Sequence, residues 1–178
     1  MSNKPSLTSI ATLRARARGH VERGAVTTYV GDRDVVLRLL NEALATEIVC
    51  VLRYKRHYFA ASGIHSQAVK AEFLEHADQE LAHADTLAQR IVELGGMPNF
   101  SPVGILDRSH AEYTEGTTLY EMLREDLIAE RVAIESYSEM IAYIGADDPT
   151  TRRVLEDILA QEEEHADDLR SLLEGMSG

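Results

Sequence analysis

A Glu and a His three residues apart occur twice in this chain, within Glu80-Leu81-Ala82-His83 and within Glu162-Glu163-Glu164-His165. A lone acidic residue precedes each pair: Glu47 stands 33 residues before Glu80, and Glu130 stands 32 residues before Glu162. Side chains three or four positions apart share one face of an α-helix. Each pair can therefore bind one ion together, and the duplication indicates two matching halves.

The composition is that of one folded domain with a helical tendency. The chain has 178 residues, of which 44% are apolar and 27% are charged, with 4 prolines, and this length supports one hydrophobic core. No apolar run approaches the length that spans a membrane. The single cysteine, Cys50, excludes an intramolecular disulfide and a thiolate cluster, and it fits a reducing cytoplasm.

Charge divides the chain into two parts. The net charge is −12, but residues 1–31 hold five basic residues and one acidic residue, giving +4, so the remainder carries −16. We therefore expect a basic extension (1–31) and an acidic domain (32–178) that suits cations. Helical spacing of apolar residues from Leu7 to Ala17 predicts a short helix in the extension. This helix either docks on the bundle or a neighbouring subunit, or it serves as an arm that contacts DNA phosphates.

Four long stretches have apolar residues at helical spacing. Turn residues separate the first from the second and the third from the fourth, whereas residues 97–116 form the one long connection, with a short helix expected around 105–112. The pattern predicts an all-α protein: a four-helix bundle of two hairpins joined by a long crossover between helices 2 and 3. The predicted helices are about 32–61, 66–94, 117–144 and 149–174.

The apolar faces of these helices are interrupted by carboxylates and imidazoles at matching positions. One inward Glu or His is usually a satisfied polar contact, but a duplicated set of six is harder to explain in that way. Burying four carboxylates without a counter-charge would cost many kcal/mol. Two divalent ions would balance the four negative charges, so we predict two bridged metal ions. The predicted ligands are Glu47, Glu80, His83, Glu130, Glu162 and His165.

Four further residues lie near this predicted centre. Asp126, one turn before Glu130, is expected to accept a hydrogen bond from a ligating imidazole. Tyr54 and Tyr137 each lie seven residues after the lone Glu of their half, and they are expected to hydrogen-bond a carboxylate of the centre or to act as electron donors. His76, one turn before Glu80, could bind a third, transient ion nearer the surface.

The sequence resembles the ferritin-like superfamily, and within it the bacterioferritins. The similarity covers about 33–174, and it is carried by the spacing of the six predicted ligands, by the segment 123–130 and by Gln161-Glu162-Glu163-Glu164-His165. The resemblance implies an intra-subunit ferroxidase di-iron centre that oxidises Fe(II) with hydrogen peroxide or oxygen. It assigns Glu47 and His83 to one iron, Glu130 and His165 to the other, and Glu80 and Glu162 to both.

Three departures from the bacterioferritin pattern point to a smaller cage. The position of the haem-binding Met is occupied by Leu81, so no haem is expected. The chain continues for only 13 residues after His165, which leaves no room for the fifth helix of the larger ferritins. The basic extension and the long crossover resemble Dps-type dodecamers, so we expect a Dps-like mini-ferritin with a bacterioferritin-type site.

The resulting hypothesis is a cytoplasmic ferroxidase that stores ferric iron in a homo-oligomeric cage, expected to be a dodecamer, with two iron ions per subunit and manganese or zinc as substitutes. Two alternatives stay open. The first is a non-storing di-iron or di-manganese redox enzyme, such as a rubrerythrin-like peroxidase or a catalase. The second is a DNA-protecting Dps-type shell that uses the arginines of residues 1–31. Neither involves a membrane.

Overall fold

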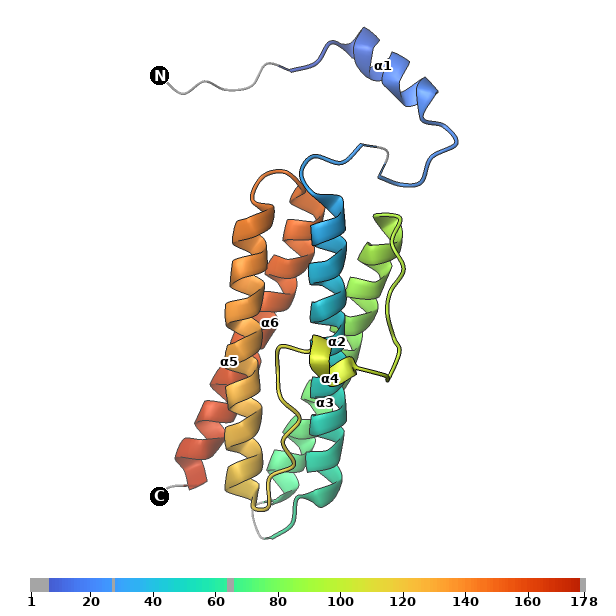
Figure 1. Ribbon diagram of the computed structural model, residues 1–178. Helices are drawn as coiled ribbons and strands as arrows, with labels where there is room; N and C mark the ends of the chain where they lie inside the picture. The colour runs from blue at the N-terminus through green and yellow to red at the C-terminus, as the bar shows by residue number, and fades with distance from the viewer. Residues whose placement is uncertain (1–6, 27, 64–65, 177–178) are drawn as a thin grey trace.

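The computed structural model describes residues 7–26, 28–63 and 66–176. These residues form four long helices, α2 (Arg33–Ala60), α3 (Ser66–Glu93), α5 (Leu119–Ile144) and α6 (Pro149–Met176), and two short ones, α1 (Ile10–Gly19) and α4 (Ile105–Arg108). The long helices lie side by side as a bundle, in which α2 pairs with α3 and α5 with α6 (Figure 1). The predicted all-α bundle of two hairpins with a long crossover is confirmed.

Capping residues set the starts of three long helices. Asp32 accepts a hydrogen bond from the amide of Val35, 3.2 Å away, and so begins α2. Thr118 and Glu121 form a capping box at the start of α5. The Asp148 carboxylate accepts a hydrogen bond from the Thr151 amide, at 2.9 Å, at the start of α6. The starts of α2 and α6 are therefore specified locally, as the sequence predicted, whereas α5 begins two residues later than expected.

The crossover from α3 to α5 runs along the outside of the bundle and carries α4 against α2 (Figure 1). The turn that follows α3 needs glycine twice, because Gly95 has φ +79° and a Cβ on Gly96 would meet the side chain of Leu37 at 2.5 Å. The helix expected around 105–112 is shorter than predicted, because it ends at Arg108, whose guanidinium bonds back to the carbonyls of Val103 and Gly104.

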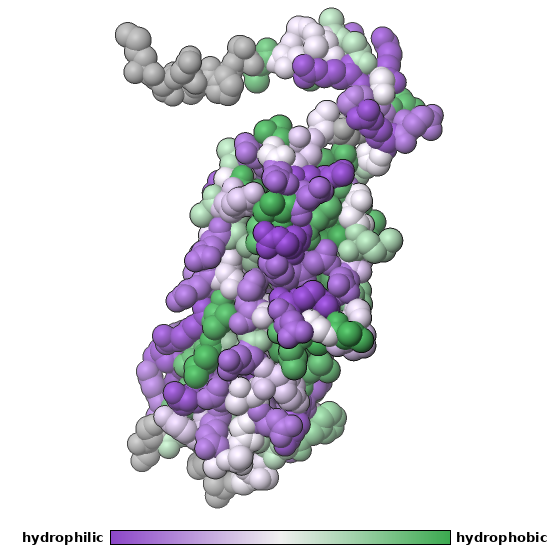
Figure 2. Space-filling model, viewed as in Figure 1, coloured by the Kyte–Doolittle hydropathy of each residue, from purple (hydrophilic) through white to green (hydrophobic). Residues whose placement is uncertain are grey.

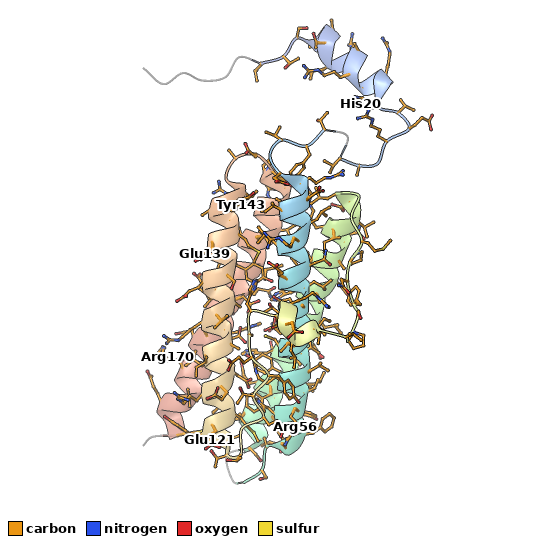
Figure 3. The ribbon with its side chains drawn as sticks, viewed as in Figure 1. His20, Arg56, Glu121, Glu139, Tyr143 and Arg170 are labelled. Carbon is orange, nitrogen blue, oxygen red and sulfur yellow. The ribbon has the colours of Figure 1, made fainter. Side chains whose placement is uncertain are left out.

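Two apolar clusters fill the core of the bundle. One surrounds Leu40, Leu87 and Ile91, and the other surrounds Phe73, Leu123 and Leu169. Charged side chains such as those of Glu139 and Arg170 point outward (Figure 3), and the face seen in Figure 2 is mostly hydrophilic with separate hydrophobic areas. None of the described helices contains a stretch long and apolar enough to cross a membrane.

The predicted short helix of the extension is present as α1, and it stands away from the bundle (Figure 1). None of its residues is buried, and Ile10 and Leu13 remain 67% and 51% exposed. Docking of α1 on its own bundle, one of the expectations, is therefore not seen. Part of the expected extension, residues 1–6 and 27, lies outside the described residues.

Candidate metal centre

Four helices each contribute acidic or imidazole side chains to one buried point in the bundle. Glu47 comes from α2 and Glu130 from α5, and each lies on the buried face of its helix. α3 and α6 each bring one Glu-x-x-His pair, whose members share a helix face. All six residues are buried, with at most 3% of their surface exposed. The residues that the structure brings together are the six predicted ones: Glu47, Glu80, His83, Glu130, Glu162 and His165.

The first half of the centre is organised around His83. Its Nδ1 lies 3.5 Å from Glu47 Oε2, 3.2 Å from Glu80 Oε2 and 3.0 Å from Glu162 Oε1. One ligand atom from each of these four residues lies within 4.8 Å of the others, which is the spacing of a metal site. Three carboxylates and one imidazole nitrogen therefore converge on a single ion-sized position.

The second half repeats this arrangement around His165. Its Nδ1 lies 3.6 Å from Glu80 Oε1, 3.8 Å from Glu130 Oε2 and 3.7 Å from Glu162 Oε2. These four residues also form a group with metal-site spacing. Glu80 and Glu162 belong to both groups, and each offers one oxygen to each half. Two such groups that share two carboxylates would hold two cations side by side.

Two glutamines fix the orientation of the imidazoles in a crossed pattern. The Nε2 of His83, on α3, lies 2.7 Å from Gln161 Oε1 on α6, and the Nε2 of His165, on α6, lies 2.7 Å from Gln79 Oε1 on α3. Because an amide oxygen only accepts, each Nε2 carries the proton. When the ring is neutral, each Nδ1 then has its lone pair toward the carboxylates, as a metal ligand requires.

The role of these glutamines was missed in the sequence, although a signal was present. A Gln immediately precedes the first Glu of both Glu-x-x-His pairs, as Gln79-Glu80 and Gln161-Glu162. A residue one position before a ligand points about 100° away from it on a helix, toward the neighbouring helix. The repeated Gln could therefore have indicated a partner for the imidazole of the other pair.

Two tyrosines make a second set of crossed contacts. The hydroxyl of Tyr54, on α2, donates to Glu130 on α5, and the hydroxyl of Tyr137, on α5, donates to Glu47 on α2. Both side chains are buried. The expectation that these tyrosines hydrogen-bond carboxylates of the centre is confirmed, and each leaves the other oxygen of its carboxylate directed to the centre.

Several polar atoms of the centre are buried without a hydrogen-bond partner. They are Oε1 of Glu80, Oε2 of Glu130, both carboxylate oxygens of Glu162 and Nδ1 of His165. An unsatisfied buried polar atom costs about 1–3 kcal/mol, and more when it is charged. The carboxylate oxygens, and the imidazole nitrogen once it is deprotonated, are electron-pair donors that face the same two positions, so a pair of cations would satisfy them together. The donor set, carboxylate oxygen with imidazole nitrogen, suits iron, manganese and zinc.

Glu47, Glu130 and Glu162 have pKa values far from the ordinary range of a carboxyl group. Burial, with the nearby charge of Glu80, raises the pKa of Glu47 well above its usual value. Burial and the charges of Glu47 and Glu130 raise the pKa of Glu162 to about 8. Burial alone would raise the pKa of Glu130 too, but contacts with His165 and Glu162 lower it to about 2. In the metal-free chain, protons thus replace part of the missing positive charge.

Protons also replace metal charge on the two histidines of the centre, His83 and His165. Burial would lower the pKa of His165, but Glu130, Glu162 and Glu80 raise it to about 12. The same opposition raises the pKa of His83, where contacts with Glu162 and Glu47 outweigh burial. A metal ion bound at either position must displace these protons, so metal binding by this centre is coupled to proton release.

The prediction that Asp126 supports a ligating imidazole is wrong. Its Oδ1 accepts a hydrogen bond from Nε of Arg53 at 2.7 Å, and its Oδ2 lies 2.8 Å from Nδ1 of His57. Arg53 and His57 also reach the crossover, through the carbonyls of Glu112, at 2.9 Å, and Thr114, at 3.1 Å. Asp126 therefore anchors the crossover to α2 and α5 instead of orienting a ligand of the centre.

Two other residues singled out in the sequence lie next to the centre. Cys50 is a buried free thiol in the apolar core, and burial raises its pKa well above the usual value. The ring of His76 stacks on that of His165, with centroids 4.1 Å apart, and its Nε2 faces Glu72 and Asp168. Glu72, His76 and Asp168 form a separate group with metal-site spacing.

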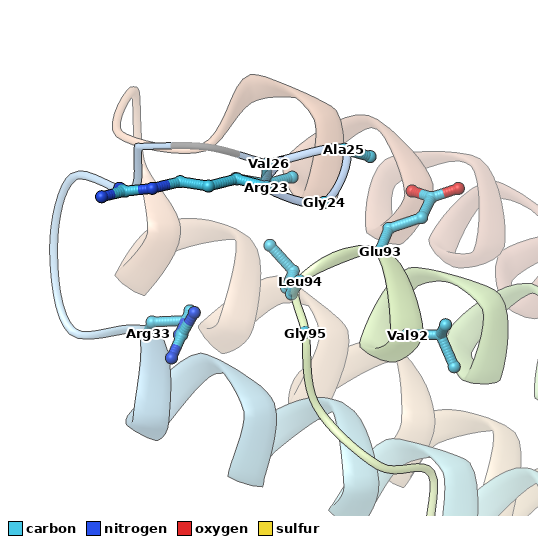
Figure 4. Close-up of a pocket in the computed structure, with 9 residues that line it drawn as sticks. All are labelled: Arg23, Gly24, Ala25, Val26, Arg33, Val92, Glu93, Leu94 and Gly95. Carbon is cyan, nitrogen blue, oxygen red and sulfur yellow. The ribbon is translucent and has the colours of Figure 1, made fainter. Parts of the chain in front are cut away.

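The hollow near the N-terminal segment is a different place from the metal centre. A surface hollow of about 540 Å³ lies between residues 23–26, Arg33 and the end of α3 at residues 92–95 (Figure 4). None of the six centre residues lines it. The buried convergence of carboxylates and imidazoles, and not this hollow, is the candidate functional site.

Comparison with known proteins agrees with this geometry. The family described as Ferritin-like domain matches residues 37–178. The chain belongs to the ferritin-like family. Bacterioferritin BfrA of Mycobacterium tuberculosis (strain ATCC 25618 / H37Rv) is 34% identical over 147 residues, which cover 82% of this chain and 87% of that protein. The predicted resemblance to ferritins and bacterioferritins is therefore confirmed.

Two other proteins show the breadth of the ferritin-like relatives. A solved structure of a dodecameric thioferritin, the bacterioferritin-related protein of Bacteroides fragilis, has a TM-score of 0.79 and 32% identity, covering 82% of this chain and 88% of that one. A nutrient stress-induced DNA-binding protein of Synechococcus sp. (strain ATCC 27144 / PCC 6301 / SAUG 1402/1) is 29% identical over 130 residues, or 71% of this chain and 74% of that protein.

Proposed function

We propose that this chain is a ferroxidase that takes Fe(II) as its substrate, oxidises it with hydrogen peroxide or oxygen, and stores the ferric product in an oligomeric cage. The observation that carries the proposal is the pair of four-residue groups that share Glu80 and Glu162. Its support is the similarity to bacterioferritins. A reducing cytoplasm, where Fe(II) is available, is the compartment that this function requires.

In this proposal the six side chains are the metal ligands. Glu47 and His83 hold one metal ion, Glu130 and His165 hold the other, and Glu80 and Glu162 hold both. When bound, the iron pair supplies two electrons to the oxidant. The chain supplies a set rich in carboxylates, whose negative charge favours Fe(III) over Fe(II), and imidazoles fixed by Gln79 and Gln161. Manganese or zinc could occupy the same ligands.

No haem takes part in the proposed chemistry. Leu81 stands directly after the ligand Glu80 on α3, and its side chain is 45% exposed. A Leu side chain has no thioether sulfur with which to bind a haem iron. The absence of a Soret band after expression with added haem would check this point.

The test is iron uptake by the metal-free protein. Fe(II) is added with peroxide or oxygen, first at about two ions per chain and then in large excess, and ferric product is followed by absorbance. The pair Glu80→Gln/Glu162→Gln should slow oxidation on the order of a hundredfold, because both shared ligands are lost. The matched control Glu163→Gln/Glu164→Gln removes the same charge from exposed neighbours and should oxidise iron normally.

The same titration separates storage from other redox chemistry. Continued uptake far beyond the stoichiometric addition supports storage. Uptake that stops there, without mineral, points to the non-storing di-metal redox enzyme. Native mass spectrometry adds the assembly: a dodecamer of the 19.8 kDa chain has a mass of about 240 kDa. A dimer would contradict the cage.

A DNA-protecting shell is a second candidate, favoured by the exposed position of α1. Arg14, Arg16 and Arg18 are exposed on a helix that stands away from the bundle. One relative is a DNA-binding protein. In this proposal, residues 1–31 form a basic arm beside the acidic domain 32–178. A salt-dependent DNA gel shift that is lost on deletion of residues 1–31 would support it, and no shift at low salt would exclude it.

A further inference from the structure

A third group of metal-binding side chains lies outside the six residues of the centre. Glu72 and His76 stand on successive turns of α3, and Asp168 faces them from α6. The Nε2 of His76 lies 3.3 Å from Glu72 Oε1 and 3.8 Å from Asp168 Oδ2. The carboxylates reach the surface, with side-chain exposures of 29% and 47%, whereas His76 is buried, with 1% exposed.

The hydrogen bonding of His76 leaves one ring nitrogen without a partner. The Tyr54 hydroxyl gives its proton to Glu130, so it can only accept from Nδ1 of His76, which lies 3.2 Å away. Nδ1 then carries the ring proton, and Nε2 keeps its lone pair. That lone pair is buried, has no hydrogen-bond partner, and faces two carboxylates that also only accept. A cation satisfies all three groups at once.

This group is in contact with one half of the centre. The ring of His76 stacks on that of His165 at 4.1 Å, with an angle of 23° between the planes. Tyr54 joins the two places a second time, because its hydroxyl lies against both His76 and Glu130. An ion held by Glu72, His76 and Asp168 would therefore lie between solvent and the ligands of the second metal position.

The other half of the centre has no such group. The positions that correspond to Glu72, His76 and Asp168 in the duplicated pattern are occupied by Val154, Ile158 and Thr86. Ile158 is buried in an apolar cluster with Val154 packed against it. The polar set is thus specific to the side of His165, and it is not a requirement of the bundle itself.

We propose that Glu72, His76 and Asp168 form a third, transient site for a divalent transition-metal ion, which delivers Fe(II) to the position held by Glu130 and His165. The site rests on the proposed function only in its role as a supplier of Fe(II). As a place that binds a divalent cation, it rests on its own three ligands.

The first test counts the Co(II) ions bound per chain under anaerobic conditions. Co(II) serves as a substitute for Fe(II) that is not oxidised. The parent protein should bind about three ions per chain, and a Glu72→Gln/Asp168→Asn variant about two. In the background Glu80→Gln/Glu162→Gln, which disables the centre, about one ion should remain and should disappear when His76→Ile is added. Isoleucine occupies the equivalent position 158, so the bundle accommodates it at this depth.

The control for charge is Glu75→Gln/Asp167→Asn, which removes two exposed carboxylates beside the site without touching His76. It should bind as many Co(II) ions as the parent. If Glu72→Gln/Asp168→Asn also binds as many as the parent, or if the disabled-centre background binds none, the third site does not exist, whatever the centre does. A doubly protonated His76 paired with the carboxylates would give that result.

The second test measures delivery. The initial rate of Fe(II) oxidation is followed by stopped flow over a range of Fe(II) concentrations. Glu72→Gln/Asp168→Asn should raise the concentration for half-maximal rate on the order of tenfold, with the difference closing at saturation, because the third site acts before the chemistry. An unchanged concentration overturns delivery. If the parent binds the third Co(II) but oxidises no Fe(II), the ferroxidase proposal fails and the cation site stands.

Discussion

Two polar clusters are buried one helical turn apart in this bundle, and they differ in how their atoms are satisfied. In the anchor cluster, defined as Arg53, His57 and Asp126, both oxygens of Asp126 have partners at 2.7 and 2.8 Å, and Arg53 and His57 also reach backbone carbonyls of the crossover. In the metal centre, Glu162 has two buried oxygens with no hydrogen-bond partner. The first cluster is complete as it stands, whereas the second is not.

The comparison shows how to distinguish structure from function among buried charges. Buried charges that are paired and fully hydrogen-bonded are compatible with a structural role. Removing one partner of such a pair destabilises the fold, because the other charge is left buried without compensation. Unpaired electron donors that converge on one point have a cost that only a ligand removes. By this criterion the anchor cluster has a structural role in holding the crossover, whereas the centre has the features of a cation site, as we propose.

Removal of Asp126 tests the anchor cluster and should have the largest effect. Asp126→Ala leaves the guanidinium of Arg53 buried and unpaired, so we expect the free energy of unfolding to fall by about 3–5 kcal/mol. Urea unfolding of the metal-free protein measures it. Asp85→Ala, at an exposed position of α3, is the control and should change stability by less than about 0.5 kcal/mol. An equally small change for Asp126→Ala would refute the anchoring role.

The metal-free centre should make the protein less stable as the pH rises. Glu162 titrates at about 8 in the folded chain against a usual 4.5, and His165 at about 12 against 6.5. Both values are raised, so each contribution to stability is complete below the unfolded pKa and is lost as the pH rises through the folded one. Glu130, lowered to about 2, acts oppositely but only below 4.5.

Between pH 6 and pH 8 we therefore expect the free energy of unfolding to fall by about 2 kcal/mol or more. Unfolding in urea at several pH values, with a chelator present, measures the slope. Glu162→Gln removes one of the titrating groups and should reduce that slope. Stability that rises with pH over this range would show that the centre does not hold the extra protons.

Metal ions should reverse the penalty of the unsatisfied centre. At a free Co(II) concentration of about ten times the dissociation constant, each filled site should raise the free energy of unfolding by about 1.4 kcal/mol. Glu80→Gln/Glu162→Gln should lose this gain at both positions of the centre. Asp126→Ala, although unstable, should keep it, because its ligands are intact. Equal metal stabilisation of the Gln pair and the parent would contradict the assignment of the shared carboxylates.

Much of this architecture follows from local sequence. Helical spacing and turn residues specify the four long helices, and Asp32 and Asp148 mark two of their starts. The six centre residues could be found because a carboxylate or imidazole on an apolar helix face is unusual, and because the pattern is duplicated. The tyrosine contacts followed from the same duplication, since each Tyr lies seven residues after its lone Glu.

What the sequence did not predict depends on contacts between helices. Asp126 lies on the buried face of α5, as its spacing indicates. Whether its carboxylate meets an imidazole of the centre or the guanidinium of Arg53 depends on how α2 packs against α5. The ends of α4 depend on bonds that Arg108 makes across the crossover. For the same reason the crossed partners Gln79 and Gln161 escaped notice, because each serves a histidine on another helix.

Gln79 and Gln161 connect the two kinds of cluster, because their own oxygens are hydrogen-bonded while the imidazoles that they orient belong to the unsatisfied centre. Their replacement should have the smallest effect. Gln161→Leu removes the acceptor of the His83 Nε2 proton, and Gln79→Leu does the same for His165. With the tautomer no longer fixed, we expect Co(II) to bind about tenfold more weakly at the affected position, with little loss of stability. Competition with a chelator of known affinity measures it. Gln161→Glu, which restores an acceptor, should recover the affinity. If the Leu variants bound Co(II) like the parent, the ring orientation would have to come from helix packing alone.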